Sequence, residues 1–188
     1  MKKLKINLFF VFILLIFVSF AYAENISNGF MGIKWGESIA ALQGFSKLDT
    51  KDDVEFYRNP RKVYRINNYL INQAVYGFYA GKFFAVYIQV KDVEAFSEIK
   101  KYMKSTYGDP KRSLSMKSDQ IVDQWKSENV KIKLKQDKKT GAMKLAFYYM
   151  PLSTKINEDR QEEYNPHALR FLPIKRDKRP AAMPLLTF

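Results

Sequence analysis

The sequence is poor in the side chains on which most enzyme sites depend. Its 188 residues include no cysteine and one histidine. The lack of cysteine excludes disulfides, thiol nucleophiles, thiolate metal sites and lipid attachment through a cysteine. A single imidazole excludes metal sites built from several histidines and leaves one candidate for acid–base catalysis by this residue type. These two absences say more about the function of the chain than any motif in it does.

Proline and glycine are unevenly distributed. Five of the seven prolines lie after position 150, and none of the eight glycines does. This composition predicts that residues 151–188 form an extended, basic, Pro-rich tail, and that residues 24–150 form the folded domain.

Long apolar runs are also scarce, and the one that exists lies at the start of the sequence. Leu8–Val18 is an unbroken apolar stretch that follows three lysines and precedes Ala21-Tyr22-Ala23. This three-part pattern predicts a signal peptide over residues 1–23, with cleavage after Ala23, and a periplasmic or secreted bacterial protein. Cleavage lowers the net charge from +13 to +10. The alternative is an uncleaved anchor, because residues 6–23 would span roughly 27 Å as a helix.

Residues 24–150 show the periodicities of strands. The clearest hairpin pairs Val75–Tyr79 with Phe83–Val90, and Gly81 supplies a positive φ in a three-residue loop. Other segments with strand character are Val54–Tyr57, Lys62–Ile66, Gln120–Lys126, Val130–Lys135 and Met143–Met150. In Val130–Lys135 apolar residues alternate with lysines, which predicts an antiparallel sheet with one buried face.

Two helices are expected beside these strands. A short helix is expected over Glu37–Gln43, ended by Gly44. A longer helix is expected to begin at Asp92 and to end at Gly108, with an apolar face that repeats every three to four residues. That face consists of Val93, Phe96, Ile99, Met103 and Tyr107. The sequence therefore predicts an α+β fold, an antiparallel β-sheet with two helices packed on one face, followed by the Pro-rich C-terminal tail.

Two short motifs support a resemblance to known architectures. Gly32-Ile33-Lys34-Trp35-Gly36 precedes the first expected helix, and Tyr107-Gly108-Asp109-Pro110 follows the second. With the helix-then-sheet order, they resemble small exported bacterial domains of the BamE-like and β-lactamase-inhibitor-protein-like kinds, over residues 28–150. The resemblance implies a binding or accessory role in the cell envelope and no functional residue. The chain departs from the BamE pattern because it lacks the cysteine that anchors that family to lipid.

Residues that carry catalysis elsewhere occur here in unsuitable settings. His167 lies in the Pro-rich tail, where nothing holds a general base in place, so a surface role is expected. Asp119 and Asp123 fall on one strand face but roughly 13 Å apart, beyond the ~5 to 9.5 Å of glycosidase carboxylates. They are interpreted as solvated charges.

Metal and phosphate motifs are incomplete. The acidic stretch of Asp49, Asp52, Asp53 and Glu55 lacks the ligand spacing and central glycine of a calcium loop. Gly77–Lys82 lacks the spacing and the strand-to-helix context of a phosphate loop, so it is interpreted as a turn. No metal and no cofactor is therefore expected.

Aromatic residues are abundant, and packing is the preferred interpretation of the most prominent ones over a ligand platform. They are Trp35, Trp125, Tyr76, Tyr87, Tyr148 and Tyr149.

The remaining candidate sites are basic. The first is a lysine cluster on the strands around Val130, with Lys131, Lys133, Lys135 and Lys144 as the proposed partner-binding residues and Lys126, Lys138 and Lys139 beside them. Such a face attracts lipid headgroups, lipopolysaccharide phosphates or an acidic protein. The alternative is a solvated face whose lysines protect a sheet edge from pairing with other chains.

The second basic cluster lies in the tail, where apolar residues separate positive ones. Its proposed partner-binding residues are Arg170, Phe171, Lys175, Arg176, Lys178 and Arg179. Apolar groups spaced by basic residues suit docking on a groove or an anionic surface. The alternative is that the tail packs back on the domain or stays disordered.

These observations favour a non-enzymatic exported protein that binds an envelope protein or an anionic envelope surface. Nucleic acid is not an expected partner, because no motif combines basic and aromatic residues for its recognition. Two alternatives stay open: an envelope hydrolase or transferase that works without histidine and cysteine, and a purely structural module of a larger assembly.

Overall fold

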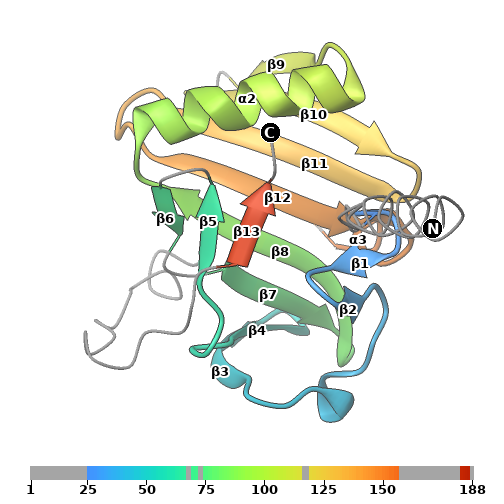
Figure 1. The fold of residues 1–188 in the computed structure, drawn as a ribbon. Coiled ribbons are helices and arrows are strands. Elements are labelled where there is room, and N and C mark those ends of the chain that lie inside the picture. The colour runs from blue at the N-terminus through green and yellow to red at the C-terminus, as the bar shows by residue number, and fades with distance from the viewer. Residues whose placement is uncertain (1–24, 67–68, 72–73, 116–118, 157–182, 187–188) are drawn as a thin grey trace, which may run out of the picture.

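A single large antiparallel sheet dominates the fold. The computed structural model describes residues 25–66, 69–71, 74–115, 119–156 and 183–186. The sheet has eight strands in the order β3-β4-β7-β8-β12-β11-β10-β9 (Figure 1). Their bounds are β3 (Ser46–Lys51), β4 (Val54–Arg58), β7 (Ala74–Tyr79), β8 (Lys82–Val90), β12 (Met143–Tyr149), β11 (Val130–Asp137), β10 (Gln120–Ser127) and β9 (Lys111–Ser115).

One long helix, α2 (Val93–Tyr107), packs on the sheet. The Asp92 side chain caps its first turn by accepting a hydrogen bond from the Ala95 N–H, and Gly108 ends it with a φ of 80°. The helix buries Ala95, Ile99 and Met103. The predicted limits of this helix are confirmed, whereas Val93, expected on the apolar face, is 70% exposed.

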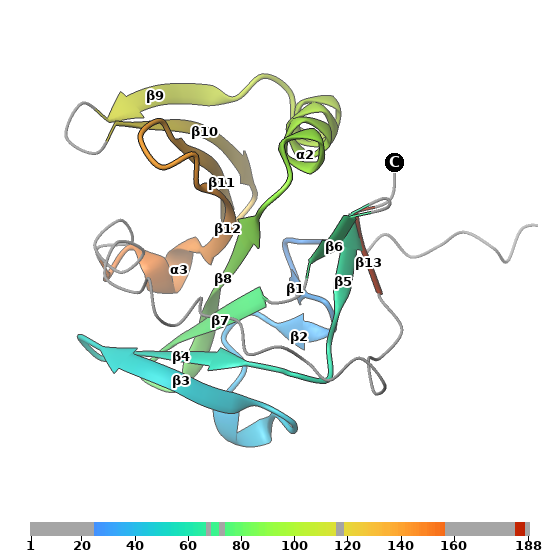
Figure 2. The ribbon, with the colours of Figure 1, turned by 90° about the vertical axis from the view of Figure 1, so that its left-hand side faces the viewer.

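Small elements complete the layer on the α2 side of the sheet (Figure 2). One is the hairpin of β1 (Gly29–Phe30) and β2 (Ile33–Lys34). The other is a three-stranded sheet in the order β13-β5-β6, made of β13 (Met183–Leu186), β5 (Tyr64–Ile66) and β6 (Tyr69–Ile71). These elements and α2 enclose the larger apolar cluster, to which they contribute Phe30, Tyr64 and Ile99.

The opposite side of the sheet carries a smaller apolar cluster. It is built from β4, β7, β8 and β12, with Phe56, Tyr87 and Tyr148 among its members. The single-turn helix α3 (Met150–Ser153) lies on this side, and Leu152 and Ile156 pack against the cluster. Figure 2 shows the sheet bent around the side that holds α3.

The predicted fold class is wrong in its helices. The described residues are mostly β, with one long helix. The helix expected over residues 37–43 is a 3₁₀ turn, η2 (Ile39–Ala41), with no buried residue. Gly36 and Gly44 confine that segment to seven positions, which is too few for a helix that is stable by itself. Since α3 lies on the face opposite α2, two helices do not share one face.

The strand predictions had a different outcome in the sheet centre and at its edges. The β7–β8 hairpin is confirmed, although its loop has two residues, Ala80 and Gly81, both with positive φ. The sequence analysis missed β3 and β9, which form the two edges of the large sheet. Edge strands are commonly polar on both faces, so they lack the apolar alternation by which strands are recognised.

Three sequence predictions lie outside the described residues. They are the signal peptide over residues 1–23, the surface role of His167 and the basic cluster of the tail. Within the part of the chain that the structure describes, no helix is both long and apolar enough to cross a bilayer.

Candidate functional site

The structure gathers lysines on the side of the sheet that faces away from α2. Residues paired in register on neighbouring strands share a face. Lys131 lies opposite Lys126, and Lys135 opposite Lys144. Lys133 lies opposite Gln124, which lies opposite Lys111. The resulting lysine face, on β9 to β12, consists of Lys111, Lys126, Lys131, Lys133, Lys135 and Lys144.

The lysine face thus brings together the four sheet lysines predicted as partner-binding residues. It adds Lys111, which the sequence analysis missed because β9 was not predicted. The stretch Lys111-Arg112-Ser113-Leu114-Ser115 has one apolar residue, so no apolar alternation marks it as a strand in the sequence.

Burial increases from the edge of the lysine face to its centre. Lys111 and Lys126 are exposed, whereas Lys133 and Lys135 are 8% and 5% exposed. The expected one-sided burial of β11 is therefore wrong, because both of its faces are covered. A covered lysine has few allowed conformations, so its ammonium group is held in a defined position.

Tyrosines lie among the central lysines. The Nζ atom of Lys133 lies 5.3 Å from the ring centroid of Tyr148, in cation–π range. Tyr148 in turn makes an edge contact with Tyr87, with ring centroids 5.7 Å apart. The contact fixes Lys133 against the apolar cluster that α3 covers.

The same side of the sheet holds buried hydroxyl groups without hydrogen-bond partners. Among the described residues, Tyr148 Oη and Ser153 Oγ accept and donate no hydrogen bond, although the two residues are 0% and 1% exposed. Ser153 belongs to α3, which packs on β8 and β12 beside Tyr148. A buried hydroxyl without a partner lowers stability, so this side is less optimised for folding than the α2 side.

The register places like charges opposite one another within the lysine face. The pairs Lys126–Lys131 and Lys135–Lys144 each place two ammonium groups on adjacent positions of neighbouring strands. Like charges directly opposite one another destabilise a sheet by up to about 1 kcal/mol per pair. Carboxylate or phosphate groups that bridge such lysines remove this repulsion. Ammonium groups only donate hydrogen bonds, so the face is suited to hold anions.

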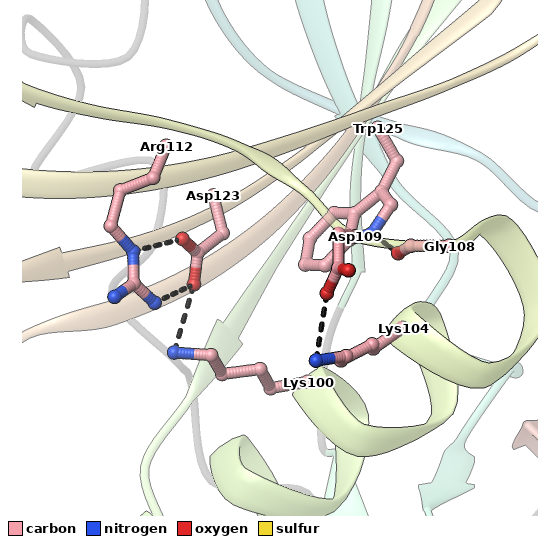
Figure 3. Close-up of polar contacts among 7 residues, drawn as sticks. All are labelled: Lys100, Lys104, Gly108, Asp109, Arg112, Asp123 and Trp125. Atoms are coloured by element: carbon pink, nitrogen blue, oxygen red, sulfur yellow. Dashed lines mark hydrogen bonds and ion pairs between the residues drawn. The ribbon is translucent and has the colours of Figure 1, made fainter.

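On the α2 side of the sheet, by contrast, opposite charges are paired (Figure 3). Asp123 is 2% exposed and lies opposite Arg112 on β9. Arg112 donates from Nε and Nη2 to its two carboxylate oxygens, at 2.6 and 3.0 Å. Lys100 of α2 lies 3.0 Å from Oδ2. The interpretation of Asp123 as a solvated charge is therefore wrong, because a helix covers this face.

The protonation of Asp123 reflects these contacts. Burial raises the pKa of the Asp123 carboxyl, but hydrogen bonds and positive charge from Arg112 and Lys100 outweigh burial, and the net pKa lies below its usual range. The ion pairs join α2 to β9 and β10. A second link is the hydrogen bond from Trp125 Nε1 to the Gly108 carbonyl oxygen, 2.9 Å long.

The other acidic residues are used in turns and surface pairs. Asp52 and Asp53 form the β3–β4 turn with φ values of 44° and 65°. Glu55 pairs with Lys47, whose hydrogen bond lowers the pKa of the Glu55 carboxyl. Asp119 lies 3.3 Å from Lys139. Over the described residues, no three histidine, aspartate or glutamate side chains are close enough to hold a metal ion.

The prominent aromatic residues take part in packing. Trp35 stacks on Phe83, with centroids 4.6 Å apart, and also on Tyr149. Its Nε1 donates to the Ile26 carbonyl oxygen at 2.8 Å. Tyr76 shares a short hydroxyl hydrogen bond with Tyr64 in the core. These contacts support the packing interpretation.

The tail residues predicted to bind a partner lie outside the described residues. They are Arg170, Phe171, Lys175, Arg176, Lys178 and Arg179. Further along, Met183–Leu186 form β13 and pair with β5. That part of the tail packs back on the domain.

Comparison of the chain with protein families, with curated proteins and with solved structures finds no match. A function is therefore inferred from the geometry of the chain itself. The resemblance to BamE-like domains stays a prediction.

Proposed function

We propose that this chain is an exported, non-enzymatic envelope protein that binds an acidic partner protein through the lysine face. The observation that carries the proposal is the register of β9 to β12, which aligns six lysines on one side of the sheet. The export signal and the envelope location are part of the proposal and rest on the sequence of residues 1–23.

The shape of the sheet favours a protein segment over a lipid surface. The sheet bends around the side that holds α3 (Figure 2), and the register places the lysines on that same side. Lys133 and Lys135, at the centre of the face, are less than 10% exposed. A flat bilayer would reach the outer lysines, Lys111 and Lys126, before the central ones. A protruding acidic segment can follow the bend along the accessible part of the face.

Binding is also better supported than catalysis. Asp123 is the buried carboxylate of the described residues, and Arg112 and Lys100 already engage both of its oxygens. A general acid or base must exchange a proton with a substrate, and two cations that hold the carboxylate ionised oppose that role. The lysine face offers cations and hydroxyls, the groups that anion binding needs.

A charge-reversal experiment tests the proposal. The double variant Lys126→Glu/Lys131→Glu changes one like-charge pair at the accessible edge of the face. The matched control, Lys101→Glu/Lys104→Glu, makes the same change in net charge on α2. We expect a fluorescent hexaglutamate peptide to bind the unaltered chain, and its Kd to rise at least tenfold in the face variant and less than twofold in the control. Anisotropy titrations report both values.

Salt and lipid arms separate the alternatives. Binding at the lysine face should weaken between about 50 and 300 mM salt, because the Debye length shortens to several ångströms. Equal losses in the two double variants would mean that net charge alone attracts the peptide, and would refute the site. Tighter binding to phosphatidylglycerol vesicles than to the peptide would refute the protein partner in favour of a lipid surface.

A further inference from the structure

The small sheet receives one strand from a distant part of the chain. β5 and β6 form an antiparallel hairpin in which Tyr64 lies opposite Ile71. β13 adds to the other edge of β5 in parallel orientation, with Met183 opposite Tyr64 and Pro184 opposite Arg65. It forms the one parallel pair among the described strands. Figures 1 and 2 show β13 beside β5.

The β5 edge offers an added strand two kinds of contact. Its backbone supplies hydrogen bonds, as the pairing with β13 shows. Its position supplies an apolar contact, because Tyr64 is fully buried and Leu185 packs against the same apolar cluster. Strand-addition sites combine these two features: backbone bonds provide affinity, and pockets for side chains provide selectivity.

β13 is held by a short ladder. It has three register pairs, as many as β5 and β6 share, but its register is irregular between Pro184 and Leu186, whereas that of β5 and β6 is regular. Pro184 also has no N–H group to donate. The β5–β6 hairpin, by contrast, is fixed from its other side by the buried Ile71. A longer strand of similar chemistry could therefore replace β13 on an edge that keeps its geometry.

An exposed apolar residue lies on the strand at the other side of β5. Leu70 on β6 is 52% exposed and lies opposite Arg65, the register partner of Pro184.

We propose that the β5 edge is a strand-addition site for an extended apolar segment of a partner protein, and that β13 is its internal occupant. The chemistry of the partner segment follows from the occupant, in which apolar residues surround a proline and run parallel to β5. Binding of the partner requires β13 to leave. This site is separate from the lysine face and does not depend on the function proposed above.

The absence of cysteine allows a reversible test in the full chain. The double variant Arg65→Cys/Pro184→Cys places two cysteines at register partners on adjacent strands. The backbones of adjacent strands lie about 4.8 Å apart, a separation that a disulfide can bridge. The probe is a labelled peptide, Ala-Ala-Met-Pro-Leu-Leu-Thr-Phe. We expect oxidation of the double variant to weaken peptide binding at least tenfold and reduction to restore it. In the single variant Arg65→Cys, neither oxidation nor reduction should change the peptide affinity. Equal binding in both redox states would overturn the proposal.

Release of β13 supplies an independent arm. Leu185→Asp in the full chain removes the apolar contact of the occupant, so the peptide should bind at least tenfold more tightly than to the unaltered chain. A peptide carrying the same Leu-to-Asp change should bind to neither. No gain in affinity while circular dichroism shows an intact fold would overturn the proposal. Disulfide-linked dimers in an oxidised mixture of the Arg65→Cys and Pro184→Cys single variants would also overturn it, because the occupant in trans would be a second copy.

Discussion

The buried polar groups on the two sides of the large sheet differ in their partners. On the α2 side, the buried carboxylate of Asp123 has two cationic partners, and the hydroxyls of Tyr64 and Tyr76 bind one another. On the other side, lysines face lysines across strands, and the hydroxyls of Tyr148 and Ser153 have no hydrogen-bond partner among the described residues. Equal burial therefore does not mean equal stabilisation.

The difference separates a side that stabilises the fold from a side with groups suited to a ligand. Polar groups that satisfy one another contribute to folding but have no capacity left for a partner. Clustered cations on one face give it a positive potential that attracts an anion. The contrast can be tested most directly where neighbouring residues of one strand point to opposite sides.

The largest effect should come from adjacent residues on β11. Leu134→Ala removes a side chain that is 1% exposed in the larger apolar cluster, and should lower the free energy of unfolding by about 2–5 kcal/mol. Lys133→Met keeps the volume but removes the charge that lies over the Tyr148 ring on the other side, and should lower it by about 0.5–2 kcal/mol. Urea unfolding measures both. Similar losses in the two variants would abolish the contrast between the sides.

A smaller effect is expected from the ion pairs of Asp123. Asp123→Asn should lower the free energy of unfolding by about 2 kcal/mol at pH 7, less than for a fully buried pair because Arg112 and Lys100 are partly exposed. The folded-state pKa of Asp123 is depressed, so its contribution is present above the unfolded pKa of about 3.9 and is lost as the pH falls below it.

Unfolding of both proteins at pH 7 and at pH 3 measures this contribution. The difference between the unaltered chain and Asp123→Asn should shrink at pH 3. Asp119→Asn is the matched control, since Asp119 pairs with an exposed lysine, and should change stability by less than about 0.5 kcal/mol. A difference that persists unchanged at pH 3 would contradict the assigned ion pairs.

The smallest effect distinguishes the tyrosine hydroxyls. Tyr76→Phe leaves the buried Tyr64 hydroxyl without this partner and should lower the free energy of unfolding by about 1 kcal/mol. Tyr148→Phe removes a hydroxyl that has no hydrogen-bond partner in the described part of the chain, and should leave stability unchanged or raise it by a few tenths of a kcal/mol. Thermal unfolding of the two variants measures both changes in stability. A larger loss for Tyr148→Phe would show that its hydroxyl is satisfied after all.

The sequence predicts those parts of the fold that have a local cause. The capping carboxylate of Asp92, the apolar repeat through Met103 and the Gly108 stop define α2. The alternation around Gly81 defines the central hairpin. No local pattern, by contrast, shows which faces other elements will cover, so the burial of Asp123 and Lys133 was not predicted.

The sequence predicts which lysines of β11 share a face, but it does not predict which other strands lie beside them. The alternation in β11 places Lys131, Lys133 and Lys135 on one face, as expected from the period of two. Lys111 joins them only through the pairing of β9 with β10, and the pairing of β13 with β5 connects positions more than a hundred residues apart. Contacts of that range depend on the whole fold.

The pairing of β13 with β5 also bears on how the domain reaches its final state. Closing a loop between Tyr64 and Met183 is entropically expensive, so this pair should form after the local hairpins and α2. Until it forms, the edge of β5 and part of the apolar cluster next to Leu185 stay open to water. We therefore expect the edge of β5 to be covered last, and chains in which it is uncovered to be the ones most open to strand pairing with other chains.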